Sequence, residues 1–345
     1  MSPNIVLTHT YLKKIGKDIE YPWGMDFIDQ NNILVTKKTG QIVKINLKTE
    51  VFEEIKGLPK IFFKGQGGLL DITVQKNDTK NKTIYFCNTI EKGGKLGTVI
   101  QKGVLDFNNN KIYNLSVIFE SNHYSKSSRH FGCRLILKNN KLYASLGDRG
   151  KRYTAQNLND DSGSIIEIDL SKLKTSEKSY QIHSIGHRNP QGLTINPFNN
   201  QIWSHEHGPR GGDEINIIKK GRNYGWPIIT SGEEYFGGKI GEGTYSPDYE
   251  NPVWTWIPSI APSGMIFYNS EMFENFKGHI LVGSLKFKSL YLVKIMDNLP
   301  YSEEIIFQNK IGRIRDVDVG ADGSIYLLTD SKKGGLFKFF KRDID

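Results

Sequence analysis

Residues 186–193, Gly-His-Arg-Asn-Pro-Gln-Gly-Leu, gather several side chains that can bind or react into one short segment. Arg188 and Asn189 carry donors that can polarise a carbonyl group and orient a hydroxyl group. The proline and glycine that follow them fix the turn that presents these donors. A second polar cluster, with His, Glu, Arg and Asp, follows at residues 205–214. Polar loops of this kind usually serve a site rather than a core, so the sequence predicts a functional site built by loops.

His130 is the candidate proton acceptor, and it stands in a segment, residues 128–134, that also holds two arginines. The ordinary imidazole pKa of about 6.5 suits proton transfer near neutral pH. A positive charge on Arg129 favours the neutral form of the ring, which is the form that accepts a proton. A histidine that only makes structural hydrogen bonds is the alternative, and the residues alone leave both interpretations open.

The loop at residues 207–214 could hold a metal ion through its backbone. Carbonyl groups of Gly208 and Pro209 in an irregular loop are exposed, and calcium accepts backbone carbonyls as readily as carboxylates, at about 2.3–2.6 Å. The acidic residues lack the spacing of an EF-hand. The alternative is a glycine-rich turn that Asp213 closes. The spacing of the residues alone is therefore weak support for a calcium site.

Arginine is used sparingly in this chain: ten of the 46 basic residues are Arg, and none precedes Arg129. A planar guanidinium grips carboxylate or phosphate oxygens more specifically than an ammonium does. Arg313 and Arg315 are two residues apart on an expected strand, so their side chains share a face. Two like charges on one face are costly unless an anion or an acid lies between them, and Asp316 points the other way. A bound polyanion and simple exposure to solvent both remain open.

The composition limits the class of protein. The net charge is +9, but the basic residues are scattered among acidic ones, which argues against a nucleic-acid binder. No stretch approaches the roughly 18 apolar residues needed to cross a membrane. Residues 4–7 are too short for the apolar region of a signal peptide, so the protein is either cytoplasmic or a mature form whose export signal has been removed.

The two cysteines, Cys87 and Cys133, do not have the spacing of a zinc or iron–sulfur site. They could form one disulfide if the fold brings them together. Buried free thiols are the default expectation.

The elements that must position these residues form a repeated pattern. A turn rich in Asn, Asp or Gly leads into an apolar strand, a polar turn and a second alternating strand, and copies begin at residues 32, 82, 140, 200, 278 and 322. The alternation favours strands over helices. Six copies predict an all-β fold, a six-bladed β-propeller formed by residues 1–345 as a single domain. A large β-sandwich or two β domains would be the alternative, but no linker divides the chain.

The loops between copies are long where the polar motifs lie, especially at residues 205–258. Long loops in a compact domain tend to be functional. In a propeller such loops gather at one mouth of the central channel, so we expect a concave site there.

The segments at residues 186–193, 205–209 and 223–227, together with Asp213 and Glu214, resemble the signature of the soluble glucose dehydrogenase and aldose sugar dehydrogenase family. The likeness runs over nearly the whole chain, with the motifs in the family's order. Residues 129–132 and 257–264 are more similar to the aldose sugar dehydrogenase branch. In the glucose branch an acid precedes the base and an aromatic residue stands in place of Ile257.

The resemblance implies the oxidation of aldose sugars or related hydroxyl compounds with pyrroloquinoline quinone (PQQ) and calcium, and an unidentified electron acceptor. It implies catalytic roles for His130, as general base, and for Arg188 and Asn189. The implied contacts to the cofactor come from Gln66, Arg188, Asn189, Ser259, Lys286, Arg313 and Arg315.

The resemblance also implies that the carbonyl groups of Gly208 and Pro209 bind the calcium ion that holds PQQ. Glu214 and the backbone of Tyr224 would bind a separate structural calcium. Enzymes of this type work in the periplasm. A non-catalytic, calcium-stabilised propeller that binds a sugar or a protein partner is the alternative function.

Overall fold

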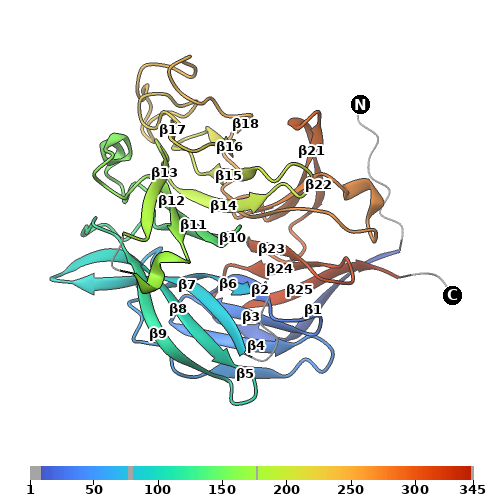
Figure 1. Cartoon of the computed structure of the whole chain (residues 1–345). Helices are drawn as coiled ribbons and strands as arrows, with labels where there is room; N and C mark the ends of the chain where they lie inside the picture. The colour runs from blue at the N-terminus through green and yellow to red at the C-terminus, as the bar shows by residue number, and fades with distance from the viewer. Residues whose placement is uncertain (1–8, 77–80, 176–177, 343–345) are drawn as a thin grey trace.

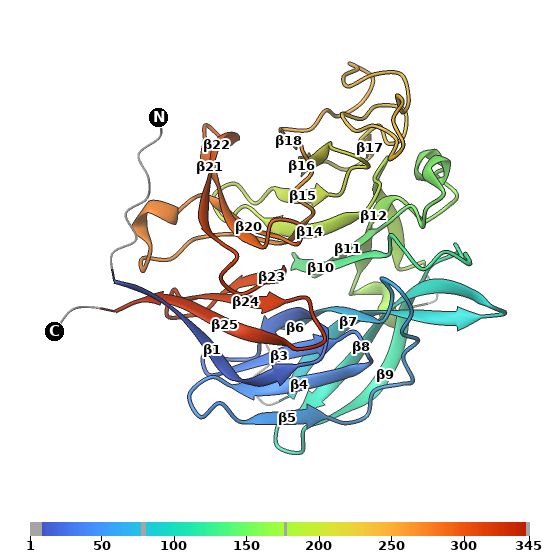
Figure 2. The ribbon, with the colours of Figure 1, turned by 180° about the vertical axis from the view of Figure 1, so that it is seen from behind.

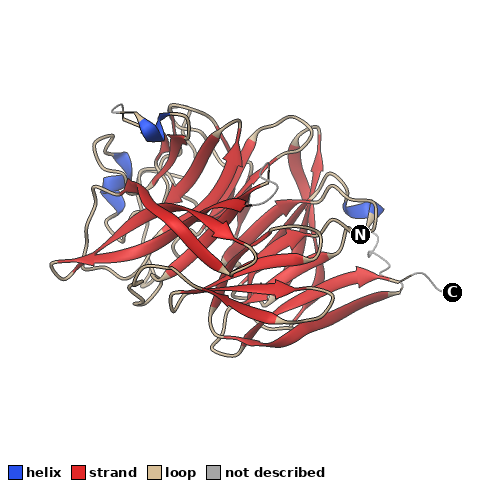
Figure 3. Cartoon of the chain, turned by 60° about the horizontal axis from the view of Figure 1, so that its bottom comes forward, coloured by secondary structure: helices blue, strands red, loops and turns tan. Residues whose placement is uncertain are grey.

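The structure is a computed structural model that describes residues 9–76, 81–175 and 178–342. In these residues the strands form six sheets (Figure 1), which are arranged as the blades of a propeller. The predicted six-bladed β-propeller is confirmed. The few helical segments are single 3₁₀ turns at the periphery (Figure 3): η1 (Arg152–Gln156), η2 (Lys172–Lys174) and η3 (Glu274–Phe276).

The first three blades follow the order of the chain. The first blade contains β2 (Pro22–Phe27), β3 (Asn32–Lys37), β4 (Gln41–Asn46) and β5 (Phe52–Ile55). The second contains β6 (Leu69–Gln75), β7 (Asn81–Lys92), β8 (Lys95–Asp106) and β9 (Lys111–Glu120). The third contains β10 (Gly132–Lys138), β11 (Lys141–Leu146), β12 (Ser164–Asp169), β13 (Tyr180–Ile185) and the short β17 (Arg222–Asn223).

The remaining blades complete the ring. The fourth blade contains β14 (Pro190–Ile195), β15 (Ile202–Glu206), β16 (Asp213–Ile218) and β18 (Trp254–Trp256). The fifth contains β19 (Pro262–Phe267), β20 (Ile280–Ser284), β21 (Ser289–Met296) and β22 (Leu299–Gln308). The sixth combines β23 (Ile314–Val319), β24 (Ile325–Thr329) and β25 (Gly334–Lys341) with the first strand of the chain, β1 (Thr10–Ile19).

The pairing of β1 with β25 joins the two ends of the described chain in one sheet. Thr10 lies opposite Lys341 and Ile15 opposite Leu336 in an antiparallel register. The two strands run side by side in both the front and the back view (Figures 1 and 2). The innermost strands β2, β6, β10, β14, β19 and β23 contact one another in a closed circle.

The repeated pattern in the sequence corresponds to the middle strands of the blades. The six copies become β3, β7, β11, β15, β20 and β24, each in a different sheet. In β3, Ile33, Leu34 and Val35 are all fully buried, because both faces of a blade pack against neighbouring blades. An outer strand such as β1 is buried at only two of its ten residues, so it alternates less strictly.

Carboxylates on the inner strands join neighbouring blades at three of the junctions. Asp26 accepts a hydrogen bond from the backbone N–H of Val74 at 2.7 Å, and Asp71 accepts one from Leu135 at 2.8 Å. Asp316 accepts one from Met25 at 3.0 Å, across the junction between the last blade and the first.

The default expectation of free thiols is wrong, because Cys87 of β7 and Cys133 of β10 form a disulfide with a Cα–Cα distance of 5.8 Å. The two residues are 46 apart in sequence, and only the placement of β10 beside β7 brings them together. The described residues contain no helix that is long and apolar enough to span a lipid bilayer.

Candidate active site

Two cavities occupy the central channel. The larger, of about 660 Å³, is lined by the C-terminal halves of the inner strands, and no histidine lines it. The smaller, of about 210 Å³, is lined by residues that precede or begin those strands and by residues that follow the second strands of the blades, so it lies at the other end of the channel. We call the smaller one the site pocket, because four of the predicted site residues line it. Those that line it are Gln66, Asn189, Arg313 and Arg315.

His130 lies at the edge of the site pocket and is held by an aspartate. Its Nδ1 is 2.7 Å from Oδ1 of Asp148, and its backbone N–H donates to Oε1 of Gln66 at 2.7 Å. Asp148 also accepts hydrogen bonds from Nε1 of Trp226 and from the backbone of Gly150. A carboxylate can only accept, so Nδ1 carries the proton and Nε2 keeps a free lone pair. This is the tautomer that a proton acceptor needs.

The surroundings keep this imidazole neutral. Burial lowers the pKa of His130, and the charges of Arg188 and Arg129 lower it further, while Asp148 opposes them. Burial alone would raise the pKa of Asp148, but its hydrogen bond with His130 brings the net pKa below the ordinary value. At neutral pH the pair is therefore a neutral ring beside an ionised carboxylate.

Arg188 and Asn189 lie between His130 and the loop at residues 207–214. Arg188 donates through Nη1 to the carbonyl of His207 at 3.0 Å, and its guanidinium lies 5.3 Å from the ring of Trp226. Oδ1 of Asn189 accepts from the backbone N–H of Gly132 at 3.3 Å. The side-chain amide nitrogen of Asn189 is thus the donor left for a ligand.

Arg313 and Arg315 share an acid that the sequence did not point to. Asp330 lies 3.3 Å from Nη2 of Arg313 and 2.8 Å from Nη2 of Arg315. Burial opposes ionisation, but Arg315 first, then Lys38 and Arg313, hold the pKa of Asp330 at about 2. The like-charge pair therefore does not require an external anion. Because three cations surround this one carboxylate, the pocket still carries excess positive charge.

Ser259 and Lys286 stand at the rim of the same pocket. The backbone N–H of Lys286 donates to the carbonyl of Ile260 at 3.2 Å, so the segment after β20 runs beside the segment before β19. The side chain of Lys286 is exposed, whereas the hydroxyl of Ser259 is buried beside Asp213.

The expected calcium loop is a tight turn closed by Asp213. Oδ1 of Asp213 accepts from the backbone N–H of Gly208 at 2.8 Å, and Oδ2 accepts from Ala261 at 2.8 Å. Burial raises the pKa of Asp213 to about 6. Within the described ranges no hydrogen bond is formed to the carbonyl oxygens of Gly208 or Pro209. These oxygens are therefore free to bind a cation.

Glu214 and Tyr224 do not line the site pocket. Glu214 lies on β16, and Tyr224 directly follows β17. Glu214 is directly opposite Glu206 in the register of β15 and β16, and burial first, then Glu206, raises its pKa well above the ordinary value. The ring of Tyr224 stacks on His187 at 4.7 Å, and no described residue donates to its carbonyl oxygen. In the part of the chain that the structure describes, no group of three or more His, Cys, Asp or Glu side chains is arranged to hold a metal.

Sequence reasoning did not assign roles to Asp148, Trp226 or Asp330. The sequence signal for Asp148 was its place in the polar turn at residues 147–150, close to the His130 segment. Asp330 had no signal, because it precedes β25 and meets Arg315 only through the pairing of β23 with β24.

The fold and the site define a class: a β-propeller with a His–Asp pair at the edge of a cationic pocket. A family model described as Glucose / Sorbosone dehydrogenase matches residues 19–338. The chain belongs to this family, as the sequence motifs predicted.

Relatives and solved structures agree with this assignment. The chain is 34% identical to the aldose sugar dehydrogenase YliI of Escherichia coli, over 94% of this chain and 91% of the relative. It superposes on the crystal structure of the apo-form of the soluble aldose sugar dehydrogenase from Escherichia coli with a TM-score of 0.87 and 31% identity, over 96% of this chain and 100% of that one. The PQQ-bound aldose sugar dehydrogenase of Streptomyces coelicolor has the same fold, with a TM-score of 0.78 at 20% identity, over 96% and 98% of the two chains.

Proposed function

We propose that this protein oxidises aldose sugars, or related hydroxyl compounds, at the hemiacetal carbon with PQQ and calcium. The observation that carries the proposal is the neutral His130, oriented by Asp148, at the edge of a pocket with excess positive charge. A proton acceptor and an anion-binding wall are what such a reaction requires from the protein.

The site pocket fits a polyanionic cofactor. PQQ carries three carboxylates, and Lys38, Arg313 and Arg315 line the pocket around a single acid. Nε of Arg315 is buried and has no hydrogen-bond partner among the described residues, so it is a donor available to a ligand. When bound, PQQ supplies the group that accepts the hydride. The residues that would hold it are Gln66, Arg188, Asn189, Ser259, Lys286, Arg313 and Arg315.

The side chains around the pocket have separate roles in the proposed reaction. Nε2 of His130 takes the proton of the substrate hydroxyl, and Asp148 stabilises the imidazolium that forms. The guanidinium of Arg188 stabilises negative charge on an oxygen atom in the pocket. The amide nitrogen of Asn189 orients the substrate by donating a hydrogen bond.

Calcium is proposed at two places. The free carbonyl oxygens of Gly208 and Pro209 would bind the ion beside the cofactor, since calcium prefers hard oxygen ligands. The carboxylate of Glu214 and the carbonyl of Tyr224 would bind a structural ion. The buried pair of Glu214 with Glu206 supports this second site, because two adjacent carboxylates need a proton or a cation between them.

The proposed location is the periplasm, and the reoxidation of the cofactor there requires an electron acceptor that remains to be identified. The Cys87–Cys133 disulfide supports this location, because disulfides persist in oxidising compartments.

The test is reconstitution. The cofactor-free protein, given PQQ and calcium, is expected to reduce a dye in the presence of aldoses, and removal of calcium with a chelator should abolish this activity. The His130→Ala variant should lose about 10²–10⁴-fold in kcat, because a positioned base contributes a factor of this size. Its affinity for PQQ, measured by absorbance titration, should be unchanged.

His279→Ala is the control, since this half-buried histidine lies before β20 and bonds to the backbone of Ile295. It should keep full activity. Undiminished activity in His130→Ala would contradict the role of the base. No absorbance change with PQQ, in a protein that calcium still stabilises, would favour a non-catalytic propeller that binds a sugar or a protein partner.

A further inference from the structure

The turn that carries His130 has a strained backbone. His130, Gly132 and Cys133 all have positive φ angles, of 56°, 65° and 75°. Glycine adopts this left-handed conformation freely, but for histidine and cysteine it costs free energy. Such residues persist in this conformation only where the surrounding structure imposes it. The turn therefore needs an anchor.

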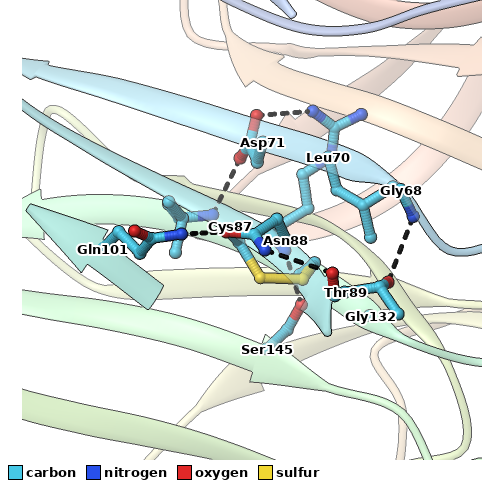
Figure 4. Close-up of a disulfide and its surroundings, with 12 residues drawn as sticks. Gly68, Leu70, Asp71, Cys87, Asn88, Thr89, Gln101, Gly132 and Ser145 are labelled. Atoms are coloured by element: carbon cyan, nitrogen blue, oxygen red, sulfur yellow. Dashed lines mark hydrogen bonds and ion pairs between the residues drawn. A yellow bond between two sulfur atoms is a disulfide. The ribbon is translucent and has the colours of Figure 1, made fainter. Parts of the chain in front are cut away.

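The disulfide anchors one end of this turn to the second blade. Cys133 is bonded to Cys87, which lies in the middle of β7 opposite Ile100 of β8. Both cysteines are fully buried, and Figure 4 shows the bond between β7 and the strand that begins at Gly132. The sequence contains only two cysteines, so this is the one disulfide that the chain can form.

The anchor on β7 is itself fixed. Asn88, next to Cys87, accepts a hydrogen bond from Gln101 at 2.7 Å and donates one to the carbonyl of Thr89 (Figure 4). The hydroxyl of Thr89 accepts the backbone N–H of Gly68 at 3.1 Å. The disulfide therefore joins the His130 turn to a rigid strand that also holds the loop of Gln66.

The other contacts of the turn depend on its backbone direction. The backbone N–H of His130 reaches Gln66 and that of Gly132 reaches Asn189, so the turn bridges residues of two other blades. If Cys133 relaxed to the extended region, both N–H groups would turn away. The imidazole would then leave Asp148.

We propose that the Cys87–Cys133 disulfide is a positioning element that holds His130 in its place between Gln66, Asp148 and Asn189. The inference rests on the proposed function, since it concerns the base of that reaction. The bond forms when the two thiols lose two protons and two electrons to a disulfide oxidant, such as oxidised glutathione, which becomes two thiols. Only the oxidised chain then holds the base in its productive position.

The first experiment compares two variants after reconstitution with PQQ and calcium. Cys87→Ala/Cys133→Ala should lose about 10–100-fold in kcat, because a small displacement of a catalytic group has effects of this size. Its affinity for PQQ should change much less than kcat, since Lys286, Arg313 and Arg315 lie on other blades, although Gln66 and Asn189 contact the turn. Cys87→Ala/Cys133→Gly should recover part of kcat, because glycine reaches the left-handed region without strain.

Ile168→Ala is the matched control for a loss of stability. Ile168 is fully buried in the same core cluster as the two cysteines, but it lies on β12. It should lower Tm and leave kcat unchanged. Parental kcat in the double alanine variant, or an equal loss of kcat in Ile168→Ala, would overturn the proposal.

The parent protein supplies a second measurement, which does not depend on how the variants fold. Chains made in a reducing compartment should show two free thiols on denaturation and have low kcat. Unfolding and refolding with oxidised glutathione, which reaches the buried cysteines only in the unfolded chain, should remove the thiols and raise kcat in proportion. Equal kcat before and after oxidation would overturn the proposal.

A third measurement needs neither cofactor nor substrate. In the cofactor-free parent, the His130 resonance should titrate below the usual histidine range. The double alanine variant should change this titration, because burial lowers the pKa of His130 and Asp148 raises it, and both effects depend on the position of the ring. An unchanged titration would overturn the positioning role. Absence of sugar oxidation in the fully oxidised parent would instead contradict the proposed function, while this titration would still test the disulfide.

Discussion

At the scale of single residues, the charge around His130 decides the pH range in which it can accept a proton. Arg129 is exposed, and its charge lowers the pKa of the ring after the larger effect of burial. A lowered pKa means that the ring stays neutral until the pH falls below the usual histidine range. The proposed activity should therefore persist in mildly acidic solution.

Replacing Arg129 with glutamine should move the acidic limb of the profile of kcat/KM against pH toward higher pH, because the pKa of His130 rises when a nearby positive charge is removed. At pH 8, where the ring is neutral in both proteins, kcat should change by less than about twofold. Lys126→Gln is the control, since Lys126 is also exposed but is not one of the charges that chiefly shift the pKa of His130. An acidic limb that stays in place would show that Arg129 does not influence the base.

Sequence reasoning could find the site residues whose type and loop position already suggested a chemical role. The arginines at 188, 313 and 315 and the histidine at 130 stood out by type and by their loops, and the structure brings them to one mouth. Their acidic partners could not be found in this way. Asp148 and Asp330 are ordinary aspartates until the fold places each of them against its cation or ring.

At the scale of elements, one buried side chain joins three inner strands of the propeller. Arg134 of β10 lies 3.3 Å from Asp71 of β6 and 2.8 Å from Asp316 of β23, and it donates to two backbone carbonyls. All three side chains are buried, and burial raises the pKa of Asp71 to about 7. The three inner strands thus share one buried charge network.

Replacing Arg134 with methionine should destabilise the cofactor-free protein by about 3–5 kcal/mol at pH 8, because it leaves two buried carboxylates without a cation. The loss of stability should be smaller at pH 5 than at pH 8. Because burial raises the pKa of both Asp71 and Asp316, these groups become neutral in the folded protein as the pH falls. Urea unfolding at the two pH values measures this difference.

Arg222→Met serves as the comparison for Arg134→Met, since Arg222 forms an exposed ion pair with Glu250. It should change stability by less than about 1 kcal/mol at either pH. If Arg134→Met lowers the free energy of unfolding by the same amount at pH 5 and pH 8, the two carboxylates are not the cause of the destabilisation.

The middle strands of the blades were predictable and the outer ones were not. Strands such as β3 and β24 are apolar on both faces and follow Asn, Asp or Gly turns, so their pattern is strong. The outer strand β22 is half exposed along most of its length, and β17 pairs through two residues. Their sequences carry little periodicity because little of their surface is buried.

At the scale of the whole molecule, the ring depends on the pairing of β1 with β25. We propose that residues 1–345 form one domain, because this pairing makes the last blade incomplete without the first strand. Ile15 is 2% exposed and packs in the core cluster shared by the first and last blades.

Replacing Ile15 with alanine should therefore cost about 2–5 kcal/mol in the free energy of unfolding, as for other buried isoleucines. Unfolding followed by circular dichroism and by tryptophan fluorescence should show a single shared transition. The exposed Lys17→Ala is the control and should have little effect. Two separate transitions in the parent would show that the chain contains more than one cooperative unit.

The shared last blade also sets an order of events during synthesis. The strand β1 leaves the ribosome early, but its partner β25 follows about 300 residues later, which is about 15–60 s at common elongation rates of about 5–20 residues per second. During that interval the backbone groups on one edge of β1 have no partner, and the nascent chain remains an open arc. Closure of the ring is therefore a late step, which can be completed only after the C-terminal strand has left the ribosome.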